Sequence, residues 1–222
     1  MGGRSIPCLV LLLLTACPAW AHQALGVGNL DTSIENPILV EDPDLSQVAY
    51  FEATQERPRI WLRFEATEGA PLLLQLGVPL IDRYAALRPA LALFGPGMSP
   101  VEVPFTPPAT EGGMVFETQG TAPTVFDEPF TGTELWQWEA EHLTAPATGT
   151  YYLVGYLPRD DAGKFMVILG VREAFSLDDI LSLPRVVFSV RAFHEVGPVG
   201  GLLLIIPMAL IAIFVAWLFF PR

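Results

Sequence analysis

Three histidines, His22, His142 and His194, are the side chains of this sequence that best suit a metal ion. If the chain is cleaved after Ala21, His22 offers an α-amine beside its imidazole, and these nitrogen donors suit copper. The sequence therefore allows periplasmic copper handling through His22, with His142 as a second imidazole, although an ordinary exposed terminus is the simpler interpretation. Zinc is disfavoured, because the chain has no H-x-x-x-H pair and both cysteines lie before residue 22.

Signatures of catalysis are missing. The histidines stand outside any G-x-S-x-G or triad context, so nucleophilic catalysis is disfavoured. Carboxylates gather at Glu41, Asp42 and Asp44 and again at Asp127 and Glu128, where they could bind calcium or act as acids and bases. No D-x-D-x-D-G loop accompanies either cluster, and acidic runs in loops are usually solvated. We expect a protein that is not an enzyme and has no resident cofactor.

Trp136 and Trp138 are the candidate ligand-binding residues. Because alternate residues of a strand share one face, both rings point to the same side of a strand expected over 135–138. If they are exposed, the pair could stack on sugar rings, as in a carbohydrate-binding or surface-adhesion module. If they are buried, the same pair belongs to the core, where large aromatic side chains dominate.

The chain begins with a segment that is typical of exported proteins. Arg4 precedes an apolar run, and the A-W-A sequence ending at Ala21 suits a cleavage site, which predicts a signal peptide over 1–21. The run is too short to span a membrane as a retained anchor. Residues 14–17 read LTAC, a pattern that also suits lipidation at Cys17, so both kinds of processing stay open.

A second apolar segment lies at the other end of the chain. Residues 199–220 carry no charged side chain, and a helix of this length can cross about 30 Å of hydrocarbon. Residues 221–222 would remain as a cytoplasmic stub, in agreement with the positive-inside rule. The sequence thus predicts a single-pass protein of a bacterial cell membrane, with its domain on the periplasmic or extracellular side. Processing of the tail by a sorting enzyme is the alternative.

Composition narrows the range of partners. The net charge is −12 and Lys164 is the only lysine, so nucleic acid and anionic lipid surfaces are disfavoured as ligands. Both cysteines lie in the leader, so the exported domain must be stable without disulfides. The remaining partners are the membrane, through the C-terminal span, and a protein, a membrane complex or a carbohydrate.

Segment 22–174 is expected to form one domain of short strands. Apolar alternation and glycine or proline punctuation predict strands over 48–51, 59–64, 72–76, 90–94, 135–138, 151–157 and 164–171. Helical patterns are few. We therefore expect a mainly β fold, an antiparallel, jelly-roll-like β-sandwich with a short C-terminal helical region and one C-terminal transmembrane helix.

Two stretches depart from this rhythm. Residues 100–130 are rich in proline, threonine, glycine and acidic residues, and they predict a long excursion over an edge or end of the sandwich. Residues 175–198 are expected to form a helical connector to the membrane span, beginning with a cap at Ser176. Pro184 should end or kink this helix, so that 186–193 forms a strand or a second short helix.

The order of several motifs resembles the pre-peptidase C-terminal domain, a small β-sandwich appended to secreted bacterial enzymes. The motifs are a strand at Tyr50 and Phe51, a turn at Gly69, a leucine-rich strand to Leu76, LALFGPG over 91–97 and TGTYYLV over 148–154. The resemblance spans 47–171 and implies assistance in folding, secretion or substrate attachment rather than catalysis. This chain departs from the pattern by its insertion over 100–130, by having no peptidase beside the domain, and by its predicted anchor.

The leading hypothesis is a membrane-anchored, extracytoplasmic β-sandwich that binds a partner protein or membrane complex without catalysis. The first alternative is a carbohydrate-binding or adhesion module built on Trp136 and Trp138. The second alternative is copper handling through His22.

Overall fold

The computed structural model describes residues 22–108, 112–159, 161–174 and 177–198. The signal peptide predicted for 1–21, the helix cap at Ser176 and the membrane span predicted for 199–220 lie outside these residues. Within the described ranges, no helix is both long and apolar enough to cross a membrane.

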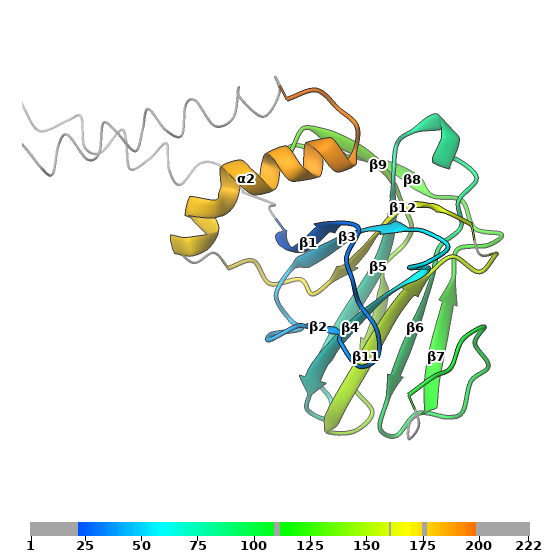
Figure 1. Ribbon diagram of the computed structural model, residues 1–222. Coiled ribbons are helices and arrows are strands. Elements are labelled where there is room, and N and C mark those ends of the chain that lie inside the picture. Colours follow the sequence, from blue (N-terminus) through cyan, green and yellow to red (C-terminus); the bar gives the residue numbers. More distant parts are fainter. Residues whose placement is uncertain (1–21, 109–111, 160, 175–176, 199–222) are drawn as a thin grey trace, which may run out of the picture.

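The described chain builds two β-sheets and one long helix (Figure 1). Sheet A has the strand order β1-β3-β12-β5-β9-β8, with β10 beside β5, and sheet B has the order β2-β4-β11-β6-β7. The strands of sheet A are β1 (Gln23–Gly28), β3 (Gln47–Ala53), β5 (Pro71–Pro79), β8 (Thr124–Glu128), β9 (Thr133–Gln137), β10 (Glu141–Thr144) and β12 (Gly163–Leu169). Those of sheet B are β2 (Ile38–Leu39), β4 (Arg59–Ala66), β6 (Ala90–Gly95), β7 (Gly112–Glu117) and β11 (Gly149–Tyr156). The helical elements are η1 (Asp82–Tyr84) and α2 (Leu177–Phe193).

The main core fills the space between the sheets, and alternation along the strands explains how. In β4, Ile60, Leu62 and Phe64 are buried on one face, and across the ladder Phe64 lies opposite Tyr151 of β11. The rings of Phe64 and Tyr151 stack with their centroids 5.6 Å apart. The seven strands predicted from periodicity are confirmed as β3, β4, β5, β6, β9, β11 and β12.

The sheets are mixed, so the expectation of a wholly antiparallel sandwich was wrong at the N-terminal side. Strand β1 runs parallel to β3, and β2 runs parallel to β4. The first four strands alternate between the sheets, because β1 and β3 belong to sheet A whereas β2 and β4 belong to sheet B. The chain between β1 and β3 therefore passes through sheet B, and the chain between β2 and β4 passes through sheet A. Such a crossover connection lets the two strands of each pair run parallel.

Helix α2 covers the outer face of sheet A (Figure 1). Val190 and Phe193 are buried there against a cluster that includes Tyr50 and Met166. Because sheet B covers one face of β12 and α2 the other, all residues of β12 are buried. The connecting role expected for 175–198 stays a prediction.

Pro184 lies inside α2, so the prediction that the helix ends at this residue and that 186–193 forms a strand was wrong. A proline removes one backbone hydrogen bond from a helix. The second half of α2 is nevertheless held in place, because Val187 and Val190 are buried and the Arg191 guanidinium donates to the carbonyl oxygens of Thr131 and Gly132 at 2.6 and 3.0 Å. These tertiary contacts outweigh the local effect of the proline.

The stretch 100–130 contains two strands that the sequence analysis missed. Strand β7 pairs with β6, and β8 pairs with β9. Before β7, Phe105 packs on the outer face of sheet B, with its ring centroid 5.2 Å from Tyr156 and 5.7 Å from Trp61. The segment expected as a long excursion therefore contains two strands and an apolar part that covers the outer face of sheet B.

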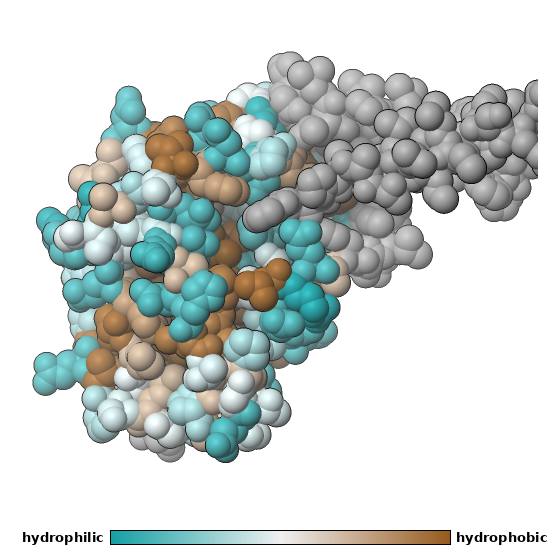
Figure 2. Space-filling view, turned by 180° about the vertical axis from the view of Figure 1, so that it is seen from behind, coloured by the Kyte–Doolittle hydropathy of each residue, from teal (hydrophilic) through white to brown (hydrophobic). Residues whose placement is uncertain are grey.

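Polar residues cover most of the surface seen from behind, and apolar residues gather in a central band (Figure 2). Over the described chain as a whole, the large apolar side chains that are exposed are Leu39, Met114, Val125, Val171 and Val196. Met114 lies on β7, an edge strand of sheet B.

Candidate functional site

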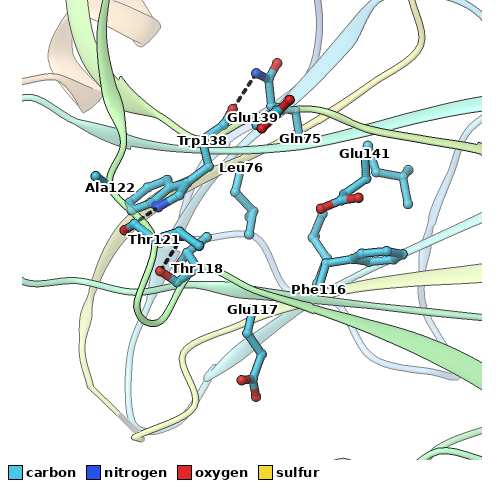
Figure 3. Close-up of a pocket in the computed structure, with 12 residues that line it drawn as sticks. Gln75, Leu76, Phe116, Glu117, Thr118, Thr121, Ala122, Trp138, Glu139 and Glu141 are labelled. Carbon is cyan, nitrogen blue, oxygen red and sulfur yellow. Dashed lines mark hydrogen bonds between the residues drawn. The ribbon is translucent and has the colours of Figure 1, made fainter.

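A cleft of about 180 Å³ opens between the two sheets. Residues of β5, β6, β7 and β10 line it, together with residues of the β7–β8 and β9–β10 connections. Its floor is apolar, because Leu74, Leu76 and Leu91 are all buried core residues. Figure 3 shows the rings of Trp138 and Phe116 on opposite sides of Leu76.

Hydrogen bonds fix the two connections that form the walls. In the β7–β8 connection, the Thr118 hydroxyl donates to the Pro89 carbonyl at 2.6 Å, and the Thr121 carbonyl accepts from the Trp138 indole N–H at 3.4 Å. In the β9–β10 connection, the Gln75 amide donates to the Trp138 carbonyl at 2.7 Å. The walls are therefore tied to both sheets, and the cleft is a built feature of the fold.

Two carboxylates, those of Glu139 and Glu141, border the cleft, whereas the Glu117 side chain extends away from it (Figure 3). Glu117, Glu139 and Glu141 are exposed, and within the described chain none of them has an ion-pair partner within 4 Å. None of the residues that line the cleft is basic. In the described ranges, no group of three or more histidine, cysteine or acidic side chains could hold a metal ion. This arrangement is suited to an organic cation with an apolar portion.

The structure places both candidate tryptophans on the core side of sheet A. Trp138 is only 6% exposed and belongs to the main core, and Trp136 is partly buried against the same cluster. The Arg88 guanidinium lies 5.7 Å from the centre of the Trp138 ring. Because that ring is already packed, Trp138 serves as a wall of the cleft and offers no open platform for a sugar.

The two histidines of the expected copper site are not brought together. His22 precedes β1 and its Nδ1 contacts the Ser46 hydroxyl, whereas His142 is exposed on β10. Three strands, β3, β12 and β5, lie between β1 and β10. Four strand spacings correspond to about 19 Å, which is too far for one metal ion. Burial also lowers the pKa of His22.

Three of the five carboxylates considered for calcium have other partners. Asp42 and Asp44 both pair with Arg172, and the Glu128 carboxylate accepts the Phe130 N–H at 2.9 Å. Burial raises the pKa of Glu128. These interactions hold turns and strand ends in place.

A polar cluster ties the end of α2 to the sheets, and the sequence analysis did not find it. The Lys164 ammonium donates to the Phe193 carbonyl at 3.0 Å and to the Glu195 carboxylate at 2.8 Å. Arg83 also pairs with Glu195, and the hydrogen bonds from Arg83 and Lys164 lower the pKa of Glu195 to about 2. His194 lies beside them, and its Nδ1–H donates to the Glu134 carbonyl at 3.1 Å.

Acid should weaken this cluster through His194. Burial, followed by the nearby charge of Lys164, lowers the pKa of His194 to about 4 despite the hydrogen bond to Glu134, and its buried Nε2 has no hydrogen-bond partner in the described chain. The unfolded chain therefore binds a proton near pH 6.5, whereas the folded chain does not until about pH 4. We expect the free energy of unfolding to fall by about 3 kcal/mol as the pH drops from 6.5 to 4.

Urea unfolding at a series of pH values checks this expectation. His194→Phe should remove most of the pH dependence, because it removes the titrating imidazole. The fold should tolerate the change, since the Glu134 carbonyl keeps the Leu80 N–H as a partner at 3.0 Å. The control is His142→Gln on the exposed surface, which should retain the pH dependence. An unchanged pH dependence in the His194→Phe protein would contradict the assignment.

Comparison with known proteins gives structural neighbours only. No protein-family model matches the chain, and no curated protein sequence matches it. The pre-peptidase C-terminal domain of a collagenase from Bacillus anthracis is 9% identical, with a TM-score of 0.31, over 67% of this chain and 96% of that domain.

Two copper-binding proteins give similar scores. CorA, a surface-associated copper-binding protein important in copper acquisition by Methylomicrobium album BG8, is 11% identical, with a TM-score of 0.31, over 68% of this chain and 100% of its own. The secreted copper-binding protein MopE of Methylococcus capsulatus is 11% identical, with a TM-score of 0.25, over 55% of this chain and 72% of its own. At these TM-scores none of the three bears on what this chain binds. The resemblance to the pre-peptidase C-terminal domain that the motifs indicated is found again among solved structures.

Proposed function

We propose that this protein is an exported, membrane-anchored binding module that captures a basic segment of a partner protein in the cleft between its sheets. Export through the leader and anchoring through 199–220 are part of the proposal, and so is the absence of catalysis. The single observation that carries it is the cleft, with its apolar floor and two carboxylates, Glu139 and Glu141, that have no ion-pair partner in the described chain.

The size of the cleft favours one side chain over a whole small molecule. Sites for drug-sized ligands usually enclose about 300–1,000 Å³. This cleft encloses about 180 Å³, and a second hollow of about 170 Å³ shares Glu117 and Thr118 with it. Two neighbouring hollows of this size are suited to two side chains of one extended segment.

Charge favours a lysine or arginine side chain in the cleft. The aliphatic stem of such a residue can lie on Leu74, Leu76 and Leu91, while its charged end reaches the carboxylates at the rim. The net charge of −12 attracts a basic partner before contact.

A fluorescein-labelled hexapeptide of alternating lysine and threonine tests the proposal by fluorescence anisotropy on the full chain. The double variant Glu139→Gln with Glu141→Gln should weaken binding about tenfold, because two surface charge pairs contribute about 0.5–1 kcal/mol each. Raising the salt concentration should weaken binding of the unaltered protein in the same direction.

The matched control removes two exposed carboxylates that do not line the cleft, through Glu35→Gln with Glu56→Gln. This variant has the same net charge, so its binding should stay within twofold of the unaltered protein. Equal losses in both double variants would reduce the effect to general attraction by an acidic protein and would contradict a specific cleft.

A further inference from the structure

Strand β7 is an unpaired edge directly beside the cleft. It pairs with β6 only, and its last two residues, Phe116 and Glu117, line the cleft. In an antiparallel pair, successive residues direct their backbone groups alternately toward the partner strand and away from it. The Gly113 N–H donates to the Ser99 carbonyl at 2.8 Å and not to β6. By this alternation, Val115 and Glu117 also direct their backbone groups away from β6.

The backbone N–H and C=O groups of Val115 and Glu117 point away from β6, and they have no backbone hydrogen-bond partner in the described chain. Such an edge can accept another strand. Proline residues flank the other edge strand near the cleft, β8, at Pro123 and Pro129. The first five residues of β7 contain neither proline nor charge, and Met114 is 43% exposed.

The direction of the side chains connects this edge to the cleft. Phe116 packs against the core between the sheets, whereas Val115 packs against the outer face of sheet B. Residues that lie opposite each other on neighbouring strands point to the same face. In a strand added to β7, the residue opposite Phe116 would therefore point between the sheets, into the cleft that Glu139 and Glu141 border.

We infer that the partner's basic segment binds as an added strand on β7, with its backbone paired to Val115 and Glu117 and a lysine or arginine opposite Phe116 in the cleft. The occupant is not a second copy of this chain, because each copy has a net charge of −12 and the two copies would repel each other. This inference rests on the proposed function and adds a binding mode and a sequence pattern to it.

Two N-methylated forms of the same lysine–threonine peptide test this binding mode without altering the protein. One form is methylated at the amides of the lysines and the other at the amides of the threonines. Only one set of amides can face β7 in an added strand. One form should therefore lose binding at least tenfold and the other should bind within about threefold of the parent peptide. Equal affinities of the two forms would overturn the inference.

A variant of the edge gives a second readout. Val115→Pro removes the outward N–H and leaves the ladder bonds of Met114 and Phe116 to β6, so the fold should persist while peptide binding weakens about tenfold. Val115→Thr keeps the N–H and should bind as the unaltered protein does.

The outcomes separate the inference from the proposed function. If the parent peptide binds, depends on Glu139 and Glu141, and tolerates both methylated forms, the cleft captures side chains and the added strand is wrong. If the parent peptide does not bind at all, the proposed function itself fails.

Discussion

Trp138→Ala should lower the free energy of unfolding by about 3–5 kcal/mol, the usual cost of deleting a buried tryptophan side chain. The ring is 6% exposed in the main core, its N–H reaches the Thr121 carbonyl, and Arg88 lies over its face. Its loss would leave a cavity beside Leu76 and free the β7–β8 connection. Urea unfolding followed by circular dichroism measures the change.

Trp136→Ala is the matched comparison, because the same residue type two positions earlier is only partly buried. Its cost should be clearly smaller. If Trp138→Ala unfolds at the same urea concentration as the unaltered protein, the ring is not part of the core. That result would favour the alternative in which Trp136 and Trp138 stack on a sugar.

Gly95→Ala should be one of the most destabilising single-methyl changes in the chain. A Cβ at this position would overlap the ring of Tyr151. The ring has little freedom to move, because its hydroxyl donates to the Ala147 carbonyl at 2.6 Å and its face stacks on Phe64. We expect a loss of about 3 kcal/mol or more, at the upper end of overpacking effects.

Gly197→Ala is the control for this substitution, because a Cβ at residue 197 would meet no other atom within 4 Å. Thermal unfolding of both variants should show a large fall in Tm for Gly95→Ala and almost none for Gly197→Ala. Equal melting temperatures would mean that β6 and β11 can separate enough to hold the extra methyl group.

Among the central strands, β4 and β5 were predictable from alternation, whereas β6 and β12 are buried at every residue and were predictable as short apolar runs between turn residues. In β4 and β5 the apolar residues recur every second position, as a sheet with one face toward the core requires. The edge strands were not predictable in this way. Strands β7 and β8 are short, contain exposed residues on both faces and lie among prolines and glycines, so their pattern resembles a loop.

In helix α2, tertiary contacts override the local sequence preference. Pro184 is a strong signal for a helix end, yet α2 continues because its second half packs on sheet A and Arg191 binds the carbonyls of Thr131 and Gly132. No local pattern could reveal that these partners, about 60 positions earlier in the chain, would be adjacent.

The candidate site was only partly predictable. The alternation of Trp136 and Trp138 correctly places both rings on one face, but the sequence could not tell which face is buried. The sequence did not single out Glu117 and Glu139. Each follows an aromatic residue, but Glu65 does so too and does not line the cleft, so this local pattern does not identify the site. The cleft exists only because β7 of sheet B and β10 of sheet A border the same hollow, and that depends on topology.

Hydrogen–deuterium exchange of the full chain, with and without saturating lysine–threonine peptide, tests the binding cleft most directly. We expect slower exchange at the backbone amides of 115–121 and 138–142, while α2 and β1 exchange as before. Protection confined to other segments, or none at a peptide concentration where anisotropy shows full binding, would contradict this expectation.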